Sequence, residues 1–374
     1  MVVLLHELGH ALSARPGGYR VTSFGIGLGP PLWSMPLRDG VVVHVDRWIL
    51  AGGACTAIPA GPPTSRRAWF HAGGLIAQGL LACALLLAPA HWLIDRISAF
   101  NLLVAVTNAL PWRFGGQASD GWYLLDAFRG GRRSGNVLQQ VSALERMADR
   151  EGAIGSHLGR AYSEVCLAWA EVLAGRPDRA ASLFIEDPPS TALEPWVDAL
   201  YRYVRAEWLR STGHLDEAIA CARGAGAGHV AGRAITRLAE ARALVDAGHT
   251  AEAHRVLAHV GGAGGAIGQQ AAAVLLHASL GESAEDVEHA AWRVLRSDGA
   301  WLDPVDAAVA LRLAGDALES AGRLDAAGGA RVGAAELARA TLASADTLVA
   351  EDLAARLAPL LTIGRSFRVQ PDAQ

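Results

Sequence analysis

The pattern of hydrophobic and polar positions changes partway along the chain. Up to about residue 133, long apolar runs carry few charges, whereas beyond about residue 157 apolar residues recur with the 3.6-residue period of a helix. This pattern predicts a mainly α protein, with an N-terminal membrane helical core that contains a small β-hairpin or re-entrant segment, and a C-terminal α-helical solenoid. We expect a core over 1–133, a linker or first helix over 134–156, a repeat domain over 157–362 and a flexible tail over 363–374.

Three apolar segments predict transmembrane helices, over about 1–14, 69–94 and 97–128. Between Arg67 and Asp95 no charged residue occurs for 27 positions, and about 20 apolar residues are enough to span a bilayer. The alternative for this middle segment is a buried core helix of a soluble protein. The first segment is shorter, because 14 residues rise about 21 Å against a hydrocarbon layer of about 30 Å. We therefore expect it to span the bilayer only if residues precede Met1.

The segment between the first two apolar runs, residues 20–50, has a different character. Val41–Val45 is a β-branched run, and the Arg38-Asp39-Gly40 tripeptide before it is typical of a turn. We predict a β-hairpin or re-entrant loop here. The glycines of the Gly25–Gly29 stretch lack the G-x-G-x-x-G spacing of a dinucleotide loop, so nucleotide binding is not predicted.

Composition and charge refine this picture. With 51% hydrophobic and 19% charged residues, the chain is neither disordered nor a strongly charged nucleic-acid binder. Residues 1–133 carry 11 Arg against 6 acids, and the remainder carries 22 Arg against 31 acids. Arginines gather over 13–68 and after 129, which the positive-inside rule places in the cytosol. We expect an integral protein of a bacterial-type plasma membrane, in contact with the lipid bilayer, with its repeat domain cytosolic.

The first apolar segment contains an HExxH motif, His6-Glu7-Leu8-Gly9-His10. On a helix, residues four apart share a face, so both imidazoles can bind one metal ion, and zinc is the usual metal for this motif. Glu7 is placed to take a proton from an activated water and pass it to a leaving amine. The alternative is a pair of packed or surface histidines, but ionisable groups in an apolar run are expensive in lipid and are functional by default. We predict one zinc ion per chain.

The third ligand is expected from a distant element. The third apolar run ends in Asn108-Ala109-Leu110-Pro111, and Asp120-Gly121 follows. With these motifs the chain resembles the site-2 protease family of intramembrane zinc metalloproteases, which has HExxH on its first core helix and N-x-x-P…D-G on its third. The small-residue stretch Ala72-Gly73-Gly74-Leu75 is a weaker match. The resemblance covers roughly residues 1–133 and rests on His6, Glu7, His10, Asn108, Pro111, Asp120 and Gly121.

The resemblance implies both the activity and the roles of these residues. His6, His10 and Asp120 would ligate zinc, Glu7 would activate water, and Asn108 would position the substrate or its oxyanion. The reaction would be hydrolysis of a peptide bond in or beside a transmembrane helix of a membrane-protein substrate. Such a helix must unwind before attack, because its carbonyls are hydrogen-bonded internally.

One departure from the family's pattern leaves choices open. The Gly-rich stretch 112–119 between Pro111 and Asp120 is longer than the family's compact version, so a loop must place Asp120. Asp126 is a second candidate for the third ligand, and Asp120 is alternatively a turn or helix N-cap residue. We also predict that Val41–Val45 pairs with an unwound substrate as an added strand.

The second half of the chain has glycines at regular intervals. The intervals between the five are 38, 35, 33 and 41 residues, close to the 34-residue period of tetratricopeptide repeats. We predict a degenerate tetratricopeptide-like solenoid in which each Gly ends a helix and, in three of five cases, an Asp three residues later starts the next. Such an array exposes a concave surface for a protein partner. The glycines are Gly175, Gly213, Gly248, Gly281 and Gly322.

Together these patterns predict a zinc-dependent intramembrane endopeptidase with a cytosolic repeat domain that binds a partner or the substrate. The alternative is a membrane-anchored, tetratricopeptide-like interaction protein whose protease core is incomplete and inactive. A third possibility is a metallopeptidase of another HExxH family that acts on soluble substrates, which needs Glu or His as the third ligand.

Overall fold

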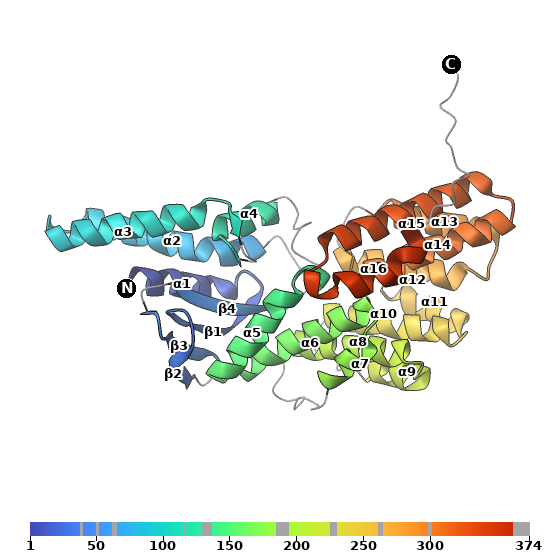
Figure 1. The fold of residues 1–374 in the computed structure, drawn as a ribbon, viewed down its shortest axis with the longest axis horizontal. Coiled ribbons are helices and arrows are strands. Elements are labelled where there is room, and N and C mark those ends of the chain that lie inside the picture. Colours follow the sequence, from blue (N-terminus) through green and yellow to red (C-terminus); the bar gives the residue numbers. More distant parts are fainter. Residues whose placement is uncertain are drawn as a thin grey trace, which may run out of the picture. The chain divides into compact units, whose positions relative to one another are not determined.

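A computed structural model shows a mainly helical protein with one small β-sheet, which confirms the predicted fold class at that level (Figure 1). Its contacts divide the chain into two compact units. The first contains Met1–Gly135, Ser142–Cys166 and Pro188–Val197, and the second contains the rest. The structure describes residues 1–37, 40–49, 52–61, 66–114, 117–128, 137–184, 194–224, 230–260, 265–297 and 301–361.

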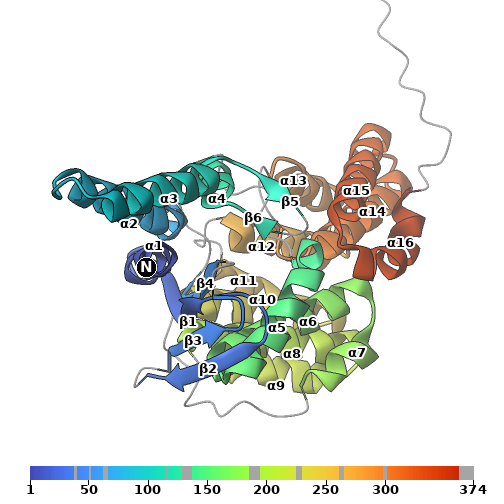
Figure 2. The same cartoon turned by 60° about the vertical axis from the view of Figure 1, so that its left-hand side comes forward.

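Helix α1 (Val2–Ala14) has one buried and one exposed face. Helices α2 (Arg67–Leu86) and α3 (Trp92–Ala109) lie side by side, and α1 packs against α2 (Figure 2). The face of α1 that carries the HExxH residues is therefore turned into the first unit. The buried side chains include His6, Glu7 and His10, and the exposed ones include Leu4, Leu8 and Leu12.

Glycines bring α1 and α2 close together. A Cβ on Gly9 would overlap the carbonyl oxygen of Gly73, and it would lie 2.7 Å from the Cβ of Ala77. A Cβ on Gly73 would overlap the Ser13 hydroxyl in turn. Small residues at both positions permit the backbones to touch, as they do in membrane helix pairs. This contact holds the imidazoles of α1 against the backbone of α2.

Among the described residues, α2 is the one helix of at least 18 residues that is apolar enough to cross a membrane. Three such helices were predicted, so that prediction is only partly supported. The predicted helix over 97–128 is wrong in its extent, because α3 ends at Ala109 and a separate helix α4 covers Asp120–Phe128. Pro111 is the cause: it lacks an N–H and excludes helical geometry at Leu110, which is extended at φ −68° and ψ 131°.

The segment predicted as a hairpin is a four-stranded mixed sheet in the order β2-β3-β1-β4. Its strands are β1 (Tyr19–Ile26), β2 (Pro31–Pro36), β3 (Val42–Asp46) and β4 (Gly53–Pro59). Strand β1 pairs in parallel with β3 and antiparallel with β4, while β2 and β3 form an antiparallel hairpin. Arg38 and Asp39 of the predicted turn lie outside the described residues, and Gly40 beside them has a positive φ of 81°.

The position of β3 corrects one functional prediction. We predicted that Val41–Val45 accepts a substrate strand, but β3 has a strand on each side. Both of its hydrogen-bonding edges are therefore occupied, and the prediction is wrong. The edges of the sheet are β2 and β4. Because β4 also packs against α1, it is the edge that lies nearest to the HExxH motif.

Helix α5 (Val141–Ile154) packs on the sheet within the first unit. Arg150 lies 3.0 Å from the carboxylate of Asp46, and the Ser23 hydroxyl donates to Glu151 Oε1 at 2.7 Å. The first half of α6 (His157–Ala174) also belongs to this unit. The contacts therefore assign residues 142–166 to the N-terminal unit, whereas the sequence pattern begins the repeat domain at 157.

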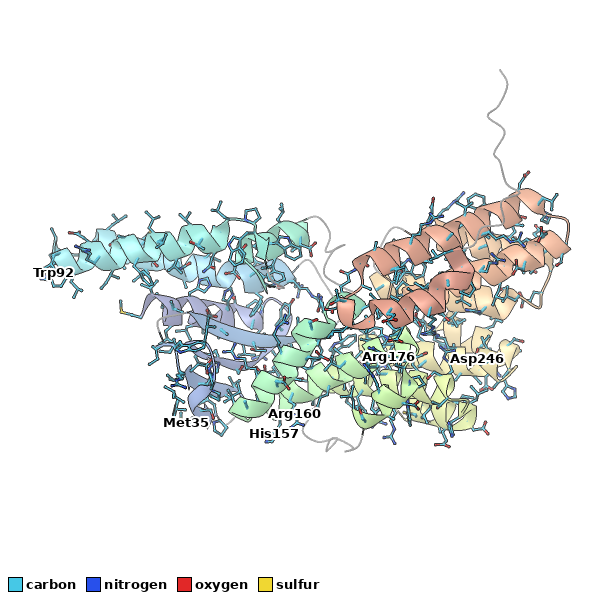
Figure 3. The ribbon with its side chains drawn as sticks, in the orientation of Figure 1. Met35, Trp92, His157, Arg160, Arg176 and Asp246 are labelled. Atoms are coloured by element: carbon cyan, nitrogen blue, oxygen red, sulfur yellow. The ribbon has the colours of Figure 1, made fainter. Side chains whose placement is uncertain are left out.

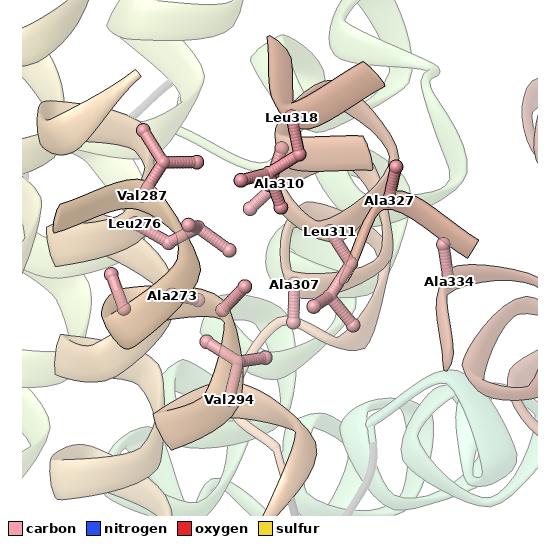
Figure 4. Close-up of a cluster of buried hydrophobic side chains, with 13 residues drawn as sticks. Ala273, Leu276, Val287, Val294, Ala307, Ala310, Leu311, Leu318, Ala327 and Ala334 are labelled. Atoms are coloured by element: carbon pink, nitrogen blue, oxygen red, sulfur yellow. The ribbon is translucent and has the colours of Figure 1, made fainter. Parts of the chain in front are cut away.

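The second unit consists of helices. A cluster of buried Ala, Val and Leu side chains from α12 to α15 forms part of its core (Figure 4). Small alanines let these helices approach closely. The remaining elements are η2 (Val137–Gln139), α7 (Pro177–Ser182), α8 (Pro195–Ser211), α9 (Leu215–Arg223), α10 (Val230–Asp246), α11 (Thr250–Ala258), α12 (Gly265–Ser279), α13 (Ala284–Leu295), α14 (Pro304–Ser320), α15 (Leu324–Ser344) and α16 (Thr347–Leu361).

Four of the five periodic glycines follow a helix and have a positive φ, which is 82° at Gly175, 83° at Gly213, 80° at Gly248 and 76° at Gly322. The φ of Gly281 is not positive. A left-handed residue after a helix favours glycine, so the prediction that these glycines end helices holds at four of the five positions. The aspartates three residues later do not start the helices. Asp216, for example, is the second residue of α9, where its charge favours the helix dipole. The tetratricopeptide-like assignment stays a prediction, and the predicted tail over 363–374 lies outside the described residues.

A buried ionic group, here called the Arg242 cluster, joins α8, α10 and the start of α14. The Arg242 guanidinium lies 3.1 Å from Glu207, 2.8 Å from Asp303 and 3.0 Å from Asp306. Asp303 also caps α14 by accepting from the Asp306 N–H at 2.9 Å. One cation thus pairs with carboxylates from separate helices, which makes the packing of these helices dependent on it.

Candidate metal centre

The two histidines of the HExxH motif converge on one point. Their Nε2 atoms lie 3.1 Å apart, and both side chains are buried. The Nδ1 atom of His10 donates to the carbonyl oxygen of Phe70 at 2.8 Å, since a carbonyl can only accept. That bond assigns the proton of His10 to Nδ1 and leaves the lone pair of Nε2 directed at the common point, as in a metal-ligating histidine.

Asp120 completes the group from a distant part of the chain. Its Oδ2 atom lies 3.1 Å from Nε2 of His6 and 3.2 Å from Nε2 of His10. Tetrahedral zinc with bonds of about 2.0–2.1 Å separates its ligand atoms by about 3.3 Å, so the three atoms fit a single ion of this kind. Within the described part of the chain, this is the one set of three His, Cys, Asp or Glu side chains found close enough to hold a metal.

Ser119 explains how a loop places Asp120. Its hydroxyl accepts from the Trp122 N–H at 3.2 Å, capping α4, and donates to the Leu110 carbonyl at 2.5 Å. The backbone between α3 and α4 forms a short hairpin of β5 (Arg113–Phe114) and β6 (Gln117–Ala118). The long insert is therefore folded back on itself. Because Ser119 is the N-cap, the alternative role of Asp120 as a capping residue is wrong, and the Asp120 carboxylate remains directed at the histidines.

The glycine motif of α2 lies directly against the two imidazoles. A Cβ on Gly74 would be 2.5 Å from Nε2 of His10 and 2.5 Å from Cε1 of His6. Any side chain at this position would displace the rings, which gives a steric reason for the small-residue stretch that the sequence showed over 72–75.

The remaining predicted site residues surround this group. Glu7 is buried on α1 beside β4, where a Cβ on Gly53 would lie 2.8 Å from Cγ of Glu7. The Nδ2 atom of Asn108 lies 3.4 Å from Nε2 of His6. Pro111 is exposed and acts by ending α3. Asp126 is buried on α4 but does not belong to the group of ligand atoms.

The structure adds a histidine that sequence reasoning missed. Nδ1 of His71 lies 4.0 Å from Oδ1 of Asp120, and its ring stacks on Tyr123 with a centroid distance of 4.6 Å. His71 immediately precedes the Ala72-Gly73 pair, so its place in the small-residue motif was the available signal. It lies beside the carboxylate oxygen that does not face His6 and His10, at a distance longer than a direct hydrogen bond.

The charges of the site also favour a divalent cation. Glu7 and Asp120 are two carboxylates in largely buried positions, and the adjacent His6 and His10 are neutral when they act as ligands. Two negative charges in an apolar setting are costly without a cation between them. A doubly charged metal ion would balance them.

A helix-borne histidine pair, an adjacent glutamate and a distant aspartate define the centre of a candidate metallopeptidase. Consistent with this class, residues 1–94 match the model of Peptidase family M50. Proteins of that family are zinc metalloproteases and membrane proteins. The match includes the HExxH motif but ends before Asn108 and Asp120. The comparisons with curated proteins and with solved structures each find no match.

Proposed function

We propose that this protein is a zinc endopeptidase of the site-2 protease type, which hydrolyses a peptide bond in or near a transmembrane segment of a membrane protein. The observation that carries the proposal is the group of ligand atoms from His6, His10 and Asp120, mutually 3.1–3.2 Å apart. An enzyme of another HExxH family would need Glu or His at the third position, whereas the third ligand proposed here is Asp120.

Each neighbouring side chain has a role in this chemistry. Zinc held by the three ligands would supply a Lewis acid that makes water more acidic and polarises the scissile carbonyl. Glu7 takes the proton of the attacking water and passes it to the departing amine. The Asn108 amide, beside His6, donates to the carbonyl oxygen as negative charge develops on it.

The free edge of β4 is the proposed docking site for the unwound substrate. In the sheet order β4 has β1 on one side only, and β4 also packs on α1 next to Glu7. An extended peptide added to that edge satisfies the backbone groups that it loses on unwinding. Strand addition at β4 would therefore bring a scissile bond toward the catalytic glutamate, a role that the interior strand β3 cannot perform.

Apolar side chains on the outer surfaces of α2 and α3 support membrane embedding. Trp92, at the start of α3, is 69% exposed (Figure 3), and aromatic residues of this kind favour the membrane interface. We propose that the lipid bilayer covers these helices and that the helical second unit binds a protein partner or the substrate in the cytosol. The exposed apolar residues include Ile76, Leu80, Leu86, Phe100, Leu102, Leu103 and Val106.

Metal content and proteolysis together test the proposal. Purified protein should contain about one zinc per chain, and His6→Ala and Asp120→Ala should abolish binding. Asp126→Asn is the matched control, since Asp126 is a buried aspartate on the same helix outside the ligand group. Glu7→Gln should retain zinc and lose cleavage of a co-expressed single-pass membrane protein. Cleavage by Glu7→Gln at the wild-type rate would refute the enzymatic proposal and favour the membrane-anchored interaction protein.

A further inference from the structure

Three buried side chains, one at the metal centre and two on the helices α2 and α3, carry polar atoms without hydrogen-bond partners. The atoms are Nδ1 of His6, both Nε2 and Oε1 of Gln78, and Oδ1 of Asn101. Gln78 on α2 is fully buried, and Asn101 on α3 is 2% exposed. Each unpartnered buried group is costly, and more so where lipid replaces water around the helices. Such a concentration of unpartnered groups beside one site requires an explanation.

The unpartnered atoms are chemically complementary. Ligation of zinc through Nε2 assigns the ring proton of His6 to Nδ1, which then becomes a donor. Gln78 offers one acceptor, Oε1, and one donor group, Nε2. Asn101 already donates from Nδ2 to the main-chain carbonyl of Gln78 at 3.0 Å, so its Oδ1 remains as an acceptor. The four atoms thus comprise two donors and two acceptors, and two hydrogen bonds would satisfy all four.

Gly74 on α2 lies against His6, and it is one helical turn before Gln78. A Cβ on Gly74 would lie 2.7 Å from Nδ1 of His6, so this nitrogen faces α2 at the level of Gly74. Gln78 is one helical turn further along α2, and helical side chains lean toward the preceding turn. The Gln78 side chain therefore leans toward the surface that Gly74 leaves uncovered, which is the surface beside His6.

We propose that Gln78 is a positioning residue for His6. Its Oε1 accepts from the Nδ1–H of His6, and its Nε2 donates to Oδ1 of Asn101, which anchors the amide on α3. Gln78 would then do for His6 what the Phe70 carbonyl does for His10. Both rings would be held in the tautomer that directs Nε2 at the metal. This inference rests on the proposed zinc site.

Zinc affinity of the full chain in detergent, measured by competition with a chromogenic chelator, tests the inference. Gln78→Met keeps the length of the side chain and removes its amide, and it should weaken zinc binding about 10- to 100-fold. Gln78→Glu keeps an acceptor for His6 and should recover most of that affinity, which a purely structural role would not predict. Leu80→Met, an exposed change two residues further along α2, is the control and should bind as wild type.

The outcomes separate the proposed zinc-peptidase function from the proposed positioning role of Gln78. If the wild-type protein binds no zinc, the proposed function fails. If the wild type and Gln78→Met bind zinc equally, the positioning role of Gln78 is overturned while the zinc site stands. Should Gln78→Met fail to fold, as judged by circular dichroism, Asn101→Leu replaces it. That variant removes the proposed outer anchor together with the Asn101 hydrogen bond to the main-chain carbonyl of Gln78, and it leaves the Gln78 amide in place. It should weaken zinc binding by a smaller factor, and unchanged affinity would overturn the inference.

Discussion

Gly121 lies so close to Ala109 that a Cβ on Gly121 would overlap the carbonyl oxygen of Ala109. The start of α4 is thereby pressed against the end of α3, and Asp120 is carried within reach of the histidines of α1. The glycine of the Asp-Gly pair thus has a steric role, and the aspartate before it has a chemical one.

Substitution of this glycine should disturb the metal centre without changing any ligand. Gly121→Ala must push α4 away from α3, so Oδ2 of Asp120 loses its place beside His6, and zinc affinity should fall at least about 10-fold. Chelator competition measures this change. Gly79→Ala is the control, because a Cβ on Gly79 meets nothing within 4 Å. Wild-type affinity in Gly121→Ala would contradict the steric role.

The contact between α1 and α2 should be equally intolerant of a methyl group. Gly9→Ala forces a Cβ into the backbone of Gly73, and overpacking of this kind costs about 1–3 kcal/mol. We expect a lower free energy of unfolding in mixed micelles of increasing denaturing detergent, followed by circular dichroism. Gly79→Ala again provides the comparison, since it adds the same methyl to a helix surface with open space. Equal stability of the two variants would exclude tight α1–α2 packing.

The Arg242 cluster should dominate the stability of the second unit. Arg242→Met leaves the buried carboxylates of Glu207, Asp303 and Asp306 without their shared cation, and loss of one partner of a buried pair costs about 3–5 kcal/mol. Urea unfolding of the full chain measures the loss. The control is Arg323→Ala, which breaks an ion pair with Glu288 at the surface of the same unit and should cost less than about 1 kcal/mol.

Stability should also depend on pH through His277. Burial opposes the charged imidazole, but the carboxylate of Asp306, 3.3 Å from Nε2, outweighs it, so the pKa of His277 is raised above 6.5. Arg242 lowers this pKa and Asp246 raises it. The folded state therefore binds the proton more tightly than the unfolded state.

It follows that the stabilisation is fully present below about pH 6.5 and is lost as the pH rises through the folded pKa. Urea unfolding between about pH 5 and 9 should show this decline, and His277→Gln should flatten it. Replacement of the exposed His249 by Gln should leave the slope unchanged. A slope that persists in His277→Gln would assign it to another group.

Local signals were sufficient for several parts of this protein. The spacing of His6 and His10 and the helical period of the segment around them predict two imidazoles on one face, and the structure has them on one face. The uncharged run after Arg67 forms the apolar helix α2. The glycines Gly175, Gly213, Gly248 and Gly322 follow helices with positive φ. Each depends on neighbours within a few residues, which a linear pattern contains.

Other features depended on contacts between distant segments. The pattern of Val41–Val45 indicates a strand, but its central position in the sheet is set by pairing with β1 and β2. Likewise, the family resemblance implied that Asp120 is a ligand, but it did not show how Asp120 reaches the histidines. The contacts of Ser119 with Leu110 and of Gly121 with Ala109 place it there. The place of His71 beside Asp120 and the burial of Gln78 on α2 likewise depend on which segments pack against them.

The sequence by itself therefore determined the helical character of the chain, the HExxH motif and the periodic breaks, because backbone propensity and side-chain period act locally. The tertiary structure alone decided which strand is an edge, where α3 stops relative to α4, and which buried polar groups surround the ligands. These depend on packing between segments far apart in the chain, as with His6 of α1 and Asp120 of α4, which are 114 residues apart in sequence and 3.1 Å apart in space, and no local pattern encodes the distance between them.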